Sequence, residues 1–237
     1  MLHAGLLIFL PPRVAAAPPV VILVSRVISF LLTCQGILHN PASKDVHYGR
    51  WSTHLPQPDG TRPQSPSDRE VVVFILGFRS SHPGGRFAPG FLDIGKAFVE
   101  MWDDAKAHNE EYGYLGKTAT MYPLETDCNN SMVYISYWKS LDHLYRFANG
   151  AVHQKGFKLF TKLQKTHPHL GLMHELYVAP KGHWETIYVN YKPFALGQSK
   201  HVVESSDGKK ETVGPLVPAE GPTWKSSRSR LGGLLSR

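Results

Sequence analysis

Hydrophobic and polar positions follow two different periods between residues 69 and 197. The run 69–78 (REVVVFILGF) is rich in β-branched residues and bounded by polar turn residues, which is typical of a buried strand. Residues 91–111 instead place apolar side chains at helical spacing, which predicts an amphipathic helix. The pattern then predicts strands at 115–124, 131–138 and 170–179, a helical region from Ser140 to Lys165 interrupted at Asn149-Gly150, and a fifth extended piece at 183–190.

This order of elements, β-α-β-β-α-β followed by an extra C-terminal strand, predicts an α+β fold with a ferredoxin-like antiparallel sheet. In that topology both helices cover one face of the sheet. The other face must therefore meet water, a ligand or a second subunit. We expect residues 69–197 to form this domain.

The flanking segments have different compositions. Residues 1–45 are apolar, and Val20–Leu38 is a 19-residue run interrupted by one charge, Arg26. Three interpretations remain open for this segment: a membrane anchor through residues 20–38, a signal-like segment, or a wrongly assigned start. Residues 46–68 contain a Pro-rich stretch and are predicted to be a linker, and residues 198–237 a disordered tail.

Charge and cysteine content exclude several classes of protein. The net charge is +7, but residues 69–197 are nearly balanced, with 14 Lys and Arg against 12 Asp and Glu. No concentrated basic stripe is present, so nucleic-acid binding is not expected. Two cysteines, Cys34 and Cys128, cannot form a disulfide framework, which favours a reducing compartment. Apart from the possible anchor, the protein is therefore expected to be cytoplasmic.

The uncovered sheet face is the expected place for chemistry. In the strand 131–138, Val133, Ile135 and Tyr137 share one face, which we expect to pack under the helices. Met132, Tyr134, Ser136 and Trp138 share the other face, which we expect to be uncovered. Such an aromatic and polar face fits a homodimer interface or a ligand cavity, and the two are compatible.

Several motifs resemble those of a known family. They are Tyr137-Trp138-Lys139-Ser140-Leu141-Asp142-His143-Leu144 leading to His153, and His174-Glu175-x-Tyr177 followed by Glu185-x-x-Tyr188-x-Asn190. With the order of elements, they are similar to the monooxygenase-like proteins of the dimeric α/β-barrel, or antibiotic biosynthesis monooxygenase-like, superfamily. More narrowly, they resemble a bacterial and fungal branch described as a domain of unknown function, over about residues 46–197.

The resemblance implies an obligate homodimer whose sheets form a barrel with ligand sites inside. Members of the superfamily include cofactor-free oxygenases of polyketide anthrones and quinols, haem-degrading enzymes and haem-dependent aldoxime dehydratases. Fungal members often act in secondary metabolism. The resemblance therefore implies a monooxygenase that acts on a hydrophobic, aromatic polyketide-type substrate.

The expected chemistry uses no cofactor. The sequence has no dinucleotide loop, P-loop or serine-hydrolase elbow, and the pair His167-Pro-His169 lacks evident further metal ligands. Cofactor-free oxygenation needs a base, a dry pocket and hydrogen-bond donors for an oxyanion. The candidate catalytic residues are His153, which matches the family's helix histidine, Trp138 and Tyr134. The candidate substrate-binding residues are His174, Glu175, Tyr188 and Asn190.

Each candidate also has a purely structural interpretation. Trp138 can be a core residue, and His153 can bond backbone at a helix terminus. Tyr188 and Asn190 can satisfy a sheet edge. His174 and Glu175 are adjacent and must point to opposite faces of a regular strand, so they are not expected to act as one pair. For the whole protein, a haem-binding dehydratase or haem-modifying protein and a non-catalytic small-ligand-binding dimer remain alternatives.

Overall fold

The computed structural model describes residues 11–63, 65–124, 130–204 and 207–231. By internal contacts the chain divides into two compact units, Met1–Val46 and His47–Arg237, and each is described by itself. The predicted hairpin loop at residues 125–129, including Cys128, lies outside the described residues.

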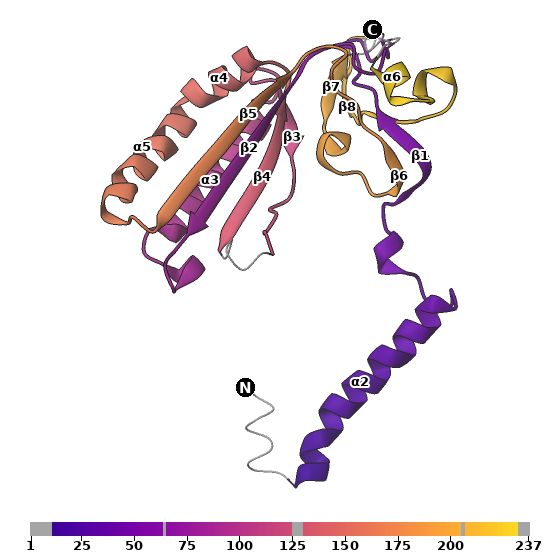
Figure 1. The fold of residues 1–237 in the computed structure, drawn as a ribbon, viewed down its shortest axis with the longest axis vertical. Coiled ribbons are helices and arrows are strands. Elements are labelled where there is room, and N and C mark those ends of the chain that lie inside the picture. Colours follow the sequence, from indigo (N-terminus) through magenta and orange to yellow (C-terminus); the bar gives the residue numbers. More distant parts are fainter. Residues whose placement is uncertain (1–10, 64, 125–129, 205–206, 232–237) are drawn as a thin grey trace. The chain divides into compact units, whose positions relative to one another are not determined.

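The first unit is dominated by one long helix, α2 (Pro12–Cys34), which is followed by a short 3-10 turn, η1 (Pro41–Ser43) (Figure 1). At about 1.5 Å per residue, its 23 residues are long enough for a hydrocarbon core of about 30 Å. Nearly all of its side chains are exposed, and Ala15 is its buried residue. By length and composition, α2 is the one described helix able to cross a membrane.

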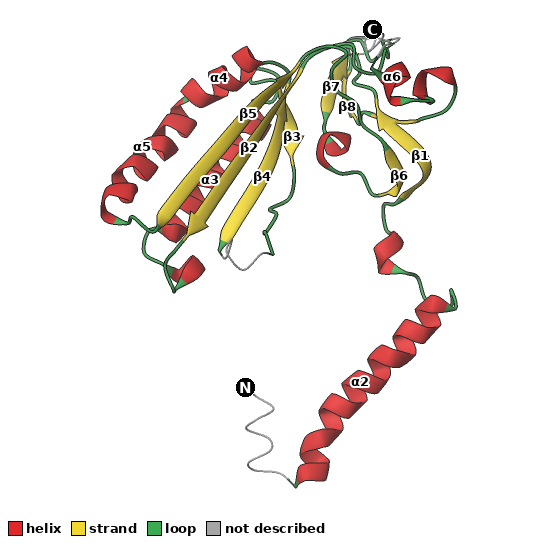
Figure 2. Cartoon of the chain, in the orientation of Figure 1, coloured by secondary structure: helices red, strands yellow, loops and turns green. Residues whose placement is uncertain are grey.

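The second unit contains the predicted ferredoxin-like sheet. Its four strands are ordered β3-β4-β2-β5, and each neighbouring pair is antiparallel (Figure 2). The sequence order of strands and helices confirms the β-α-β-β-α-β prediction. The elements are β2 (Val71–Ser80), α3 (Phe91–Ala107), β3 (Tyr114–Lys117), β4 (Ser131–Trp138), α4 (Leu141–Asn149), α5 (Ala151–Thr166) and β5 (Leu170–Ala179).

The helices α3, α4 and α5 cover one face of this sheet. Val72, Leu76 and Phe78 of β2 point toward them and are buried together with side chains of α3 and α4. The predicted interruption of the second helical region is confirmed, because α4 ends at Asn149 and α5 begins at Ala151. Ser140 caps α4 as predicted, since its Oγ accepts a hydrogen bond from the His143 backbone N–H.

The predicted assignment of the two faces of β4 is wrong. Trp138 is fully buried with Leu144 and Phe147 of α4, and Met132, on the same face, packs against the core under α3. Tyr137, from the opposite set, packs on the other side of the sheet. Alternation along a strand defines two sets of residues but not which set meets the helices. Aromatic side chains from α3 and α4 make the helix-covered face suitable for Tyr134 and Trp138.

The extra C-terminal strand joins a different sheet from the one expected. Strand β6 (Tyr188–Tyr191) pairs with β1 (His47–Thr53), and β1 also pairs with β9 (Leu216–Pro218). The linker prediction is therefore wrong for its first part, which is β1. The strand predicted at 115–124 is also shorter, because β3 ends at Lys117 and only an isolated bridge at Met121 continues the pairing.

The tail is ordered where it is described, so the prediction of a disordered segment is wrong there. A short 3-10 turn, η4 (Ala195–Gln198), leads into it. Trp224 and Arg230 are buried, and the Arg230 guanidinium forms an ion pair with Glu185. A few well-placed large side chains anchor a segment whose average composition is polar. Its elements are β7 (His201–Glu204), β8 (Lys210–Val213), β9, η5 (Pro222–Trp224) and α6 (Ser227–Arg230).

The second face of the four-stranded sheet is covered only in part. Leu55, Leu115 and Leu196 pack on Val71 at one end of β2. Farther along this face, Met173 and Tyr177 of β5 are 47% and 53% exposed. The edge strand β5 thus presents large apolar side chains to solvent.

Candidate functional site

The structure divides the seven candidate residues among three places. Tyr134, Trp138 and His174 lie on the helix-covered face of the sheet, where Leu76 of β2 pairs with both Tyr134 and His174. His153 approaches the same layer from α5. Glu175 lies on the opposite face, as the alternation predicts. The remaining two, Tyr188 and Asn190, belong to the sheet around β1.

The aromatic side chains between sheet and helices form one continuous group. The Phe147 ring lies 4.9 Å from the Trp138 ring and 5.0 Å from the His153 ring, measured between centroids. Trp102 of α3 lies 6.3 Å from Phe147 and 6.2 Å from Tyr134. We call these five residues the aromatic layer. It brings all three predicted catalytic residues into one connected set.

Trp138 is the fully buried member of this layer, and its indole N–H is already hydrogen-bonded. Its side chain is completely buried, and its Nε1 donates to Ser136 Oγ at 3.0 Å. Ser136 Oγ in turn donates to the Phe74 carbonyl oxygen at 3.2 Å. The indole N–H is therefore occupied within the strand, which favours a packing role for Trp138.

His153 has the properties of a neutral base. Burial lowers the pKa of His153 below its ordinary value, and a hydrogen bond with the Ala148 carbonyl opposes this only in part. Its Nδ1 atom is buried and has no hydrogen-bond partner among the described residues. A neutral imidazole with an unoccupied ring nitrogen can accept a proton near neutral pH.

Two polar atoms of α3 are also buried without a hydrogen-bond partner among the described residues, and the sequence analysis predicted neither. Trp102 Nε1 and Asp104 Oδ2 are buried without a partner in the described part of the chain. A buried polar atom left unpaired costs about 1–3 kcal/mol, so such atoms in a native protein call for a bound partner or water. Trp102 lies within the amphipathic helix predicted at 91–111, and nothing in that helical pattern indicates an unpaired N–H.

Lys117 of β3 places a positive charge beside the aromatic layer. Its Nζ lies 4.9 Å from the centroid of the Tyr134 ring and 5.6 Å from that of Trp102. Partial burial lowers the pKa of Lys117 from its ordinary value. The sequence marked Lys117 only as a strand residue, because its partners lie on β4 and α3.

His174 lies on the edge strand β5 and is exposed to solvent. Its ring stacks on the Phe74 ring of β2, with 5.3 Å between the ring centroids. Glu175 accepts a hydrogen bond from the Tyr177 hydroxyl at 2.5 Å on the other face. The two side chains are therefore separated by the sheet and do not act on one ligand within this chain.

Tyr188 and Asn190 have structural roles in the sheet around β1. The Tyr188 hydroxyl donates to the Phe194 carbonyl oxygen and accepts from the Gly197 N–H, both at 3.0 Å. Burial raises the pKa of Tyr188 to about 12. Asn190 adopts a left-handed backbone with φ of 49°, and its Oδ1 accepts from the Gly49 N–H at 2.8 Å. The Tyr188 contacts fix η4 against β6, and the Asn190 contact joins β6 to β1.

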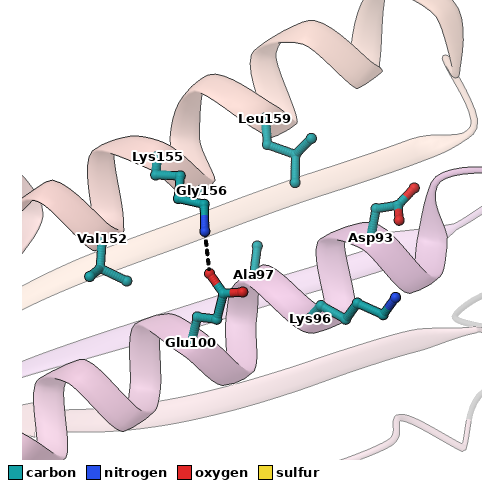
Figure 3. Close-up of a pocket in the computed structure, with 8 residues that line it drawn as sticks. All are labelled: Asp93, Lys96, Ala97, Glu100, Val152, Lys155, Gly156 and Leu159. Carbon is teal, nitrogen blue, oxygen red and sulfur yellow. Dashed lines mark hydrogen bonds and ion pairs between the residues drawn. The ribbon is translucent and has the colours of Figure 1, made fainter.

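Two surface hollows lie away from the aromatic layer. One is a groove of about 370 Å³ between α3 and α5, crossed by the Lys155–Glu100 ion pair at 2.8 Å (Figure 3). The other, of about 280 Å³, lies on the uncovered sheet face beside Gly77 and Met173. Neither is lined by the candidate catalytic residues.

The described residues do not form a site for a metal ion or a haem. Among the described residues, no group of three His, Cys, Asp or Glu side chains is placed to hold a metal ion. His153, which the resemblance offers as a haem-site residue, meets the Phe147 ring edge-on at 5.0 Å. An axial histidine binds haem iron through a ring nitrogen, and neither of the two hollows is lined by His153, so the described residues do not form a haem site there.

Comparison with known proteins identifies the family. Monooxygenase af470 of Aspergillus fumigatus is 33% identical over 234 residues, which cover 98% of this chain and 84% of that protein. Among solved structures, SnoaB, a cofactor-independent oxygenase from Streptomyces nogalater, is 18% identical; the match covers 46% of this chain and 91% of that chain, with a TM-score of 0.31. An aldoxime dehydratase is 16% identical; the match covers 82% of this chain and 45% of that chain, with a TM-score of 0.46. The model of the monooxygenase af470-like family matches residues 71–196, and the chain belongs to this family of enzymes.

Proposed function

We propose that this monooxygenase oxidises a hydrophobic aromatic substrate of the polyketide type, as in secondary metabolism, with molecular oxygen and without flavin, haem or metal. The observation that carries the proposal is the neutral His153 at the edge of the aromatic layer, with a buried and unpaired Nδ1. Family membership supports the reaction type. The layer supports the substrate class, because flat rings pack well against the partly exposed Trp102 and Tyr134.

The proposed reaction balances with oxygen as the only oxidant. His153 accepts a proton from an activated CH₂ group, and the resulting carbanion passes one electron to O₂. The substrate radical and superoxide then combine into a peroxide, which takes up the proton held by His153. Loss of water from this hydroperoxide leaves a ketone, so CH₂ and O₂ become C=O and H₂O. The protein supplies a base, a dry aromatic site and donors for the anion.

The direct test is oxygen consumption by the purified full chain in detergent, with 1,8-dihydroxyanthrone as substrate. We expect uptake of one O₂ for each ketone formed, by a protein without visible absorption. A Soret band that accompanies activity would contradict the cofactor-free mechanism. Binding of the anthrone without oxygen uptake above the rate in buffer would instead favour a non-catalytic ligand-binding protein.

We also propose that two copies associate through the uncovered face of the sheet. This face carries partly exposed Ile75, Val133 and Ile135 beside exposed Met173 and Tyr177. Aromatic and apolar side chains of this kind are favoured at stable subunit interfaces. Light scattering of the detergent-purified protein should give the mass of two chains, and a single-chain mass at micromolar concentration would contradict the proposal.

For the location, we propose that α2 anchors the protein in a membrane. The helix is exposed and apolar over 23 residues, although Arg26 near its middle costs about 2.5–3.5 kcal/mol on insertion scales. Deletion of residues 1–46 should move the protein from the membrane pellet to the supernatant after centrifugation. All Trp residues of the chain lie beyond residue 46 and remain in the truncated protein. An unchanged tryptophan emission spectrum would therefore verify that residues 47–237 are folded. Pelleting of the truncated protein with membranes would contradict the anchor.

A further inference from the structure

The positively charged Lys117 has no counter-ion among the described residues. Its ammonium group donates one hydrogen bond, to the Thr118 carbonyl oxygen at 3.3 Å. An ammonium has three donors, so further donors remain available. Among the described residues, no carboxylate forms an ion pair with Lys117, and partial burial lowers its pKa.

The surroundings of Lys117 combine this charge with flat aromatic surfaces. Its Nζ lies over both the Tyr134 and the Trp102 rings, and the Trp102 Nε1 is itself buried and unpaired. All three side chains are partly exposed, whereas Trp138 deeper in the layer is completely buried. Solvent therefore reaches part of each of the three residues.

The chemistry of these groups selects one class of ligand. The partly exposed Tyr134 and Trp102 side chains favour contact with an aromatic ring, and the Lys117 ammonium, which lies over their faces, attracts a negative charge at the edge of that ring. A neutral aromatic would gain only the ring contact. An aromatic whose hydroxyl ionises would gain a charge-assisted hydrogen bond in addition.

We infer that Lys117 determines substrate specificity by binding the oxygen of a phenolate or enolate, so that the enzyme takes up its aromatic substrate as the anion. This inference rests on the proposed function, because the carbanion that His153 forms is conjugated with this oxygen, and the charge that Lys117 binds there belongs to the electron-rich system that reduces oxygen. It adds to that function a requirement for an ionisable hydroxyl conjugated with the reacting carbon. The Asp104 carboxylate of α3 contacts His108, with 3.1 Å between Oδ1 and Nδ1.

The test compares para-nitrophenol with para-nitroanisole, its methyl ether, which cannot ionise. The full chain in detergent should bind the phenol at least about tenfold more tightly than the ether, as expected for one charge-assisted hydrogen bond. The yellow colour of the bound anion should also persist to a lower pH than it does in free solution. Equal affinities, or an unshifted colour change, would overturn the inference.

Variants separate a charge effect from a structural one. Lys117→Met keeps the length of the side chain and should reduce the preference for the phenol to within about twofold, whereas Lys117→Arg should retain it. Lys158→Met, on the exposed surface of α5, is the matched control and should leave the preference unchanged. A retained preference in Lys117→Met would overturn the inference. If Lys117→Met does not fold, Lys117→Gln, which also lacks the charge, takes its place and should likewise lose the preference for the phenol.

The binding test and the oxygen-uptake test can fail independently. A preference for the phenol that depends on Lys117, without oxygen uptake on the anthrone, would uphold the inference and contradict the proposed function. Oxygen uptake that is unchanged in Lys117→Met, together with equal binding of phenol and ether, would uphold the function and overturn the inference.

Discussion

The variant His153→Gln is expected to consume oxygen about 10²–10⁴-fold more slowly than the unmodified protein, the usual contribution of a positioned general base. The Ala148 carbonyl still accepts a hydrogen bond from Gln154 Nε2 at 2.7 Å in this variant, so the end of α4 should be preserved. It cannot accept the substrate proton. The measurement is the initial rate of oxygen consumption at saturating anthrone.

The pH dependence of the same rate gives a second readout. Because burial lowers the pKa of His153, the imidazole stays neutral at pH values where an exposed histidine is already charged. Activity should therefore fall only when the pH drops below the ordinary histidine value of about 6.5. In His153→Gln this acid limb should disappear from the residual rate.

His183→Gln is the matched control, because His183 is exposed and hydrogen-bonds only locally with the Lys181 carbonyl. It should retain the full rate and the acid limb. If His153→Gln is as active as this control, His153 is not the base. The proposed function would then need another proton acceptor.

The order of the ferredoxin-like elements was predictable from the sequence because it depends on local signals. The β-branched run at 71–80, the helical spacing of α3 and the break at Gly150 are each visible within one segment of chain. The pairing of β6 with β1 was not predictable in this way. It joins residues more than 130 positions apart, and no local pattern in either strand specifies its partner.

The site was predicted only in part, and for a definite physical reason. Tyr134 and Trp138 do share one face, as alternation requires, but the choice between covered and open face depends on helices elsewhere in the chain. Trp102 and Lys117 were missed because their importance depends on tertiary contacts. An unpaired N–H or an isolated ammonium group has no signature in the sequence around it.

The variant Trp138→Ala is expected to lower the free energy of unfolding of residues 47–237 by about 3–5 kcal/mol, as for other fully buried aromatic residues. The indole is completely buried, with ring centroids 5.0 Å from Tyr114 and 4.9 Å from Phe147. Alanine would leave a cavity between β4 and α4. Denaturant unfolding followed by tryptophan fluorescence measures this unit alone, because residues 1–46 contain no tryptophan. Phe87→Ala, at a side chain that is 93% exposed, should stay within about 0.5 kcal/mol.

Trp138→Phe separates packing from a direct part in the reaction. Phenylalanine keeps most of the ring contacts and removes Nε1, whose hydrogen bond goes to Ser136 and not to a ligand. The loss of that bond should cost about 0.5–1.5 kcal/mol of stability, because Ser136 can still donate to the Phe74 carbonyl. Oxygen uptake per folded molecule should then stay within a few-fold of the unmodified rate. A loss as large as that expected for His153→Gln would show that the indole N–H leaves Ser136 to bind the substrate anion, and Trp138 would regain the catalytic role suggested by its place in the sequence.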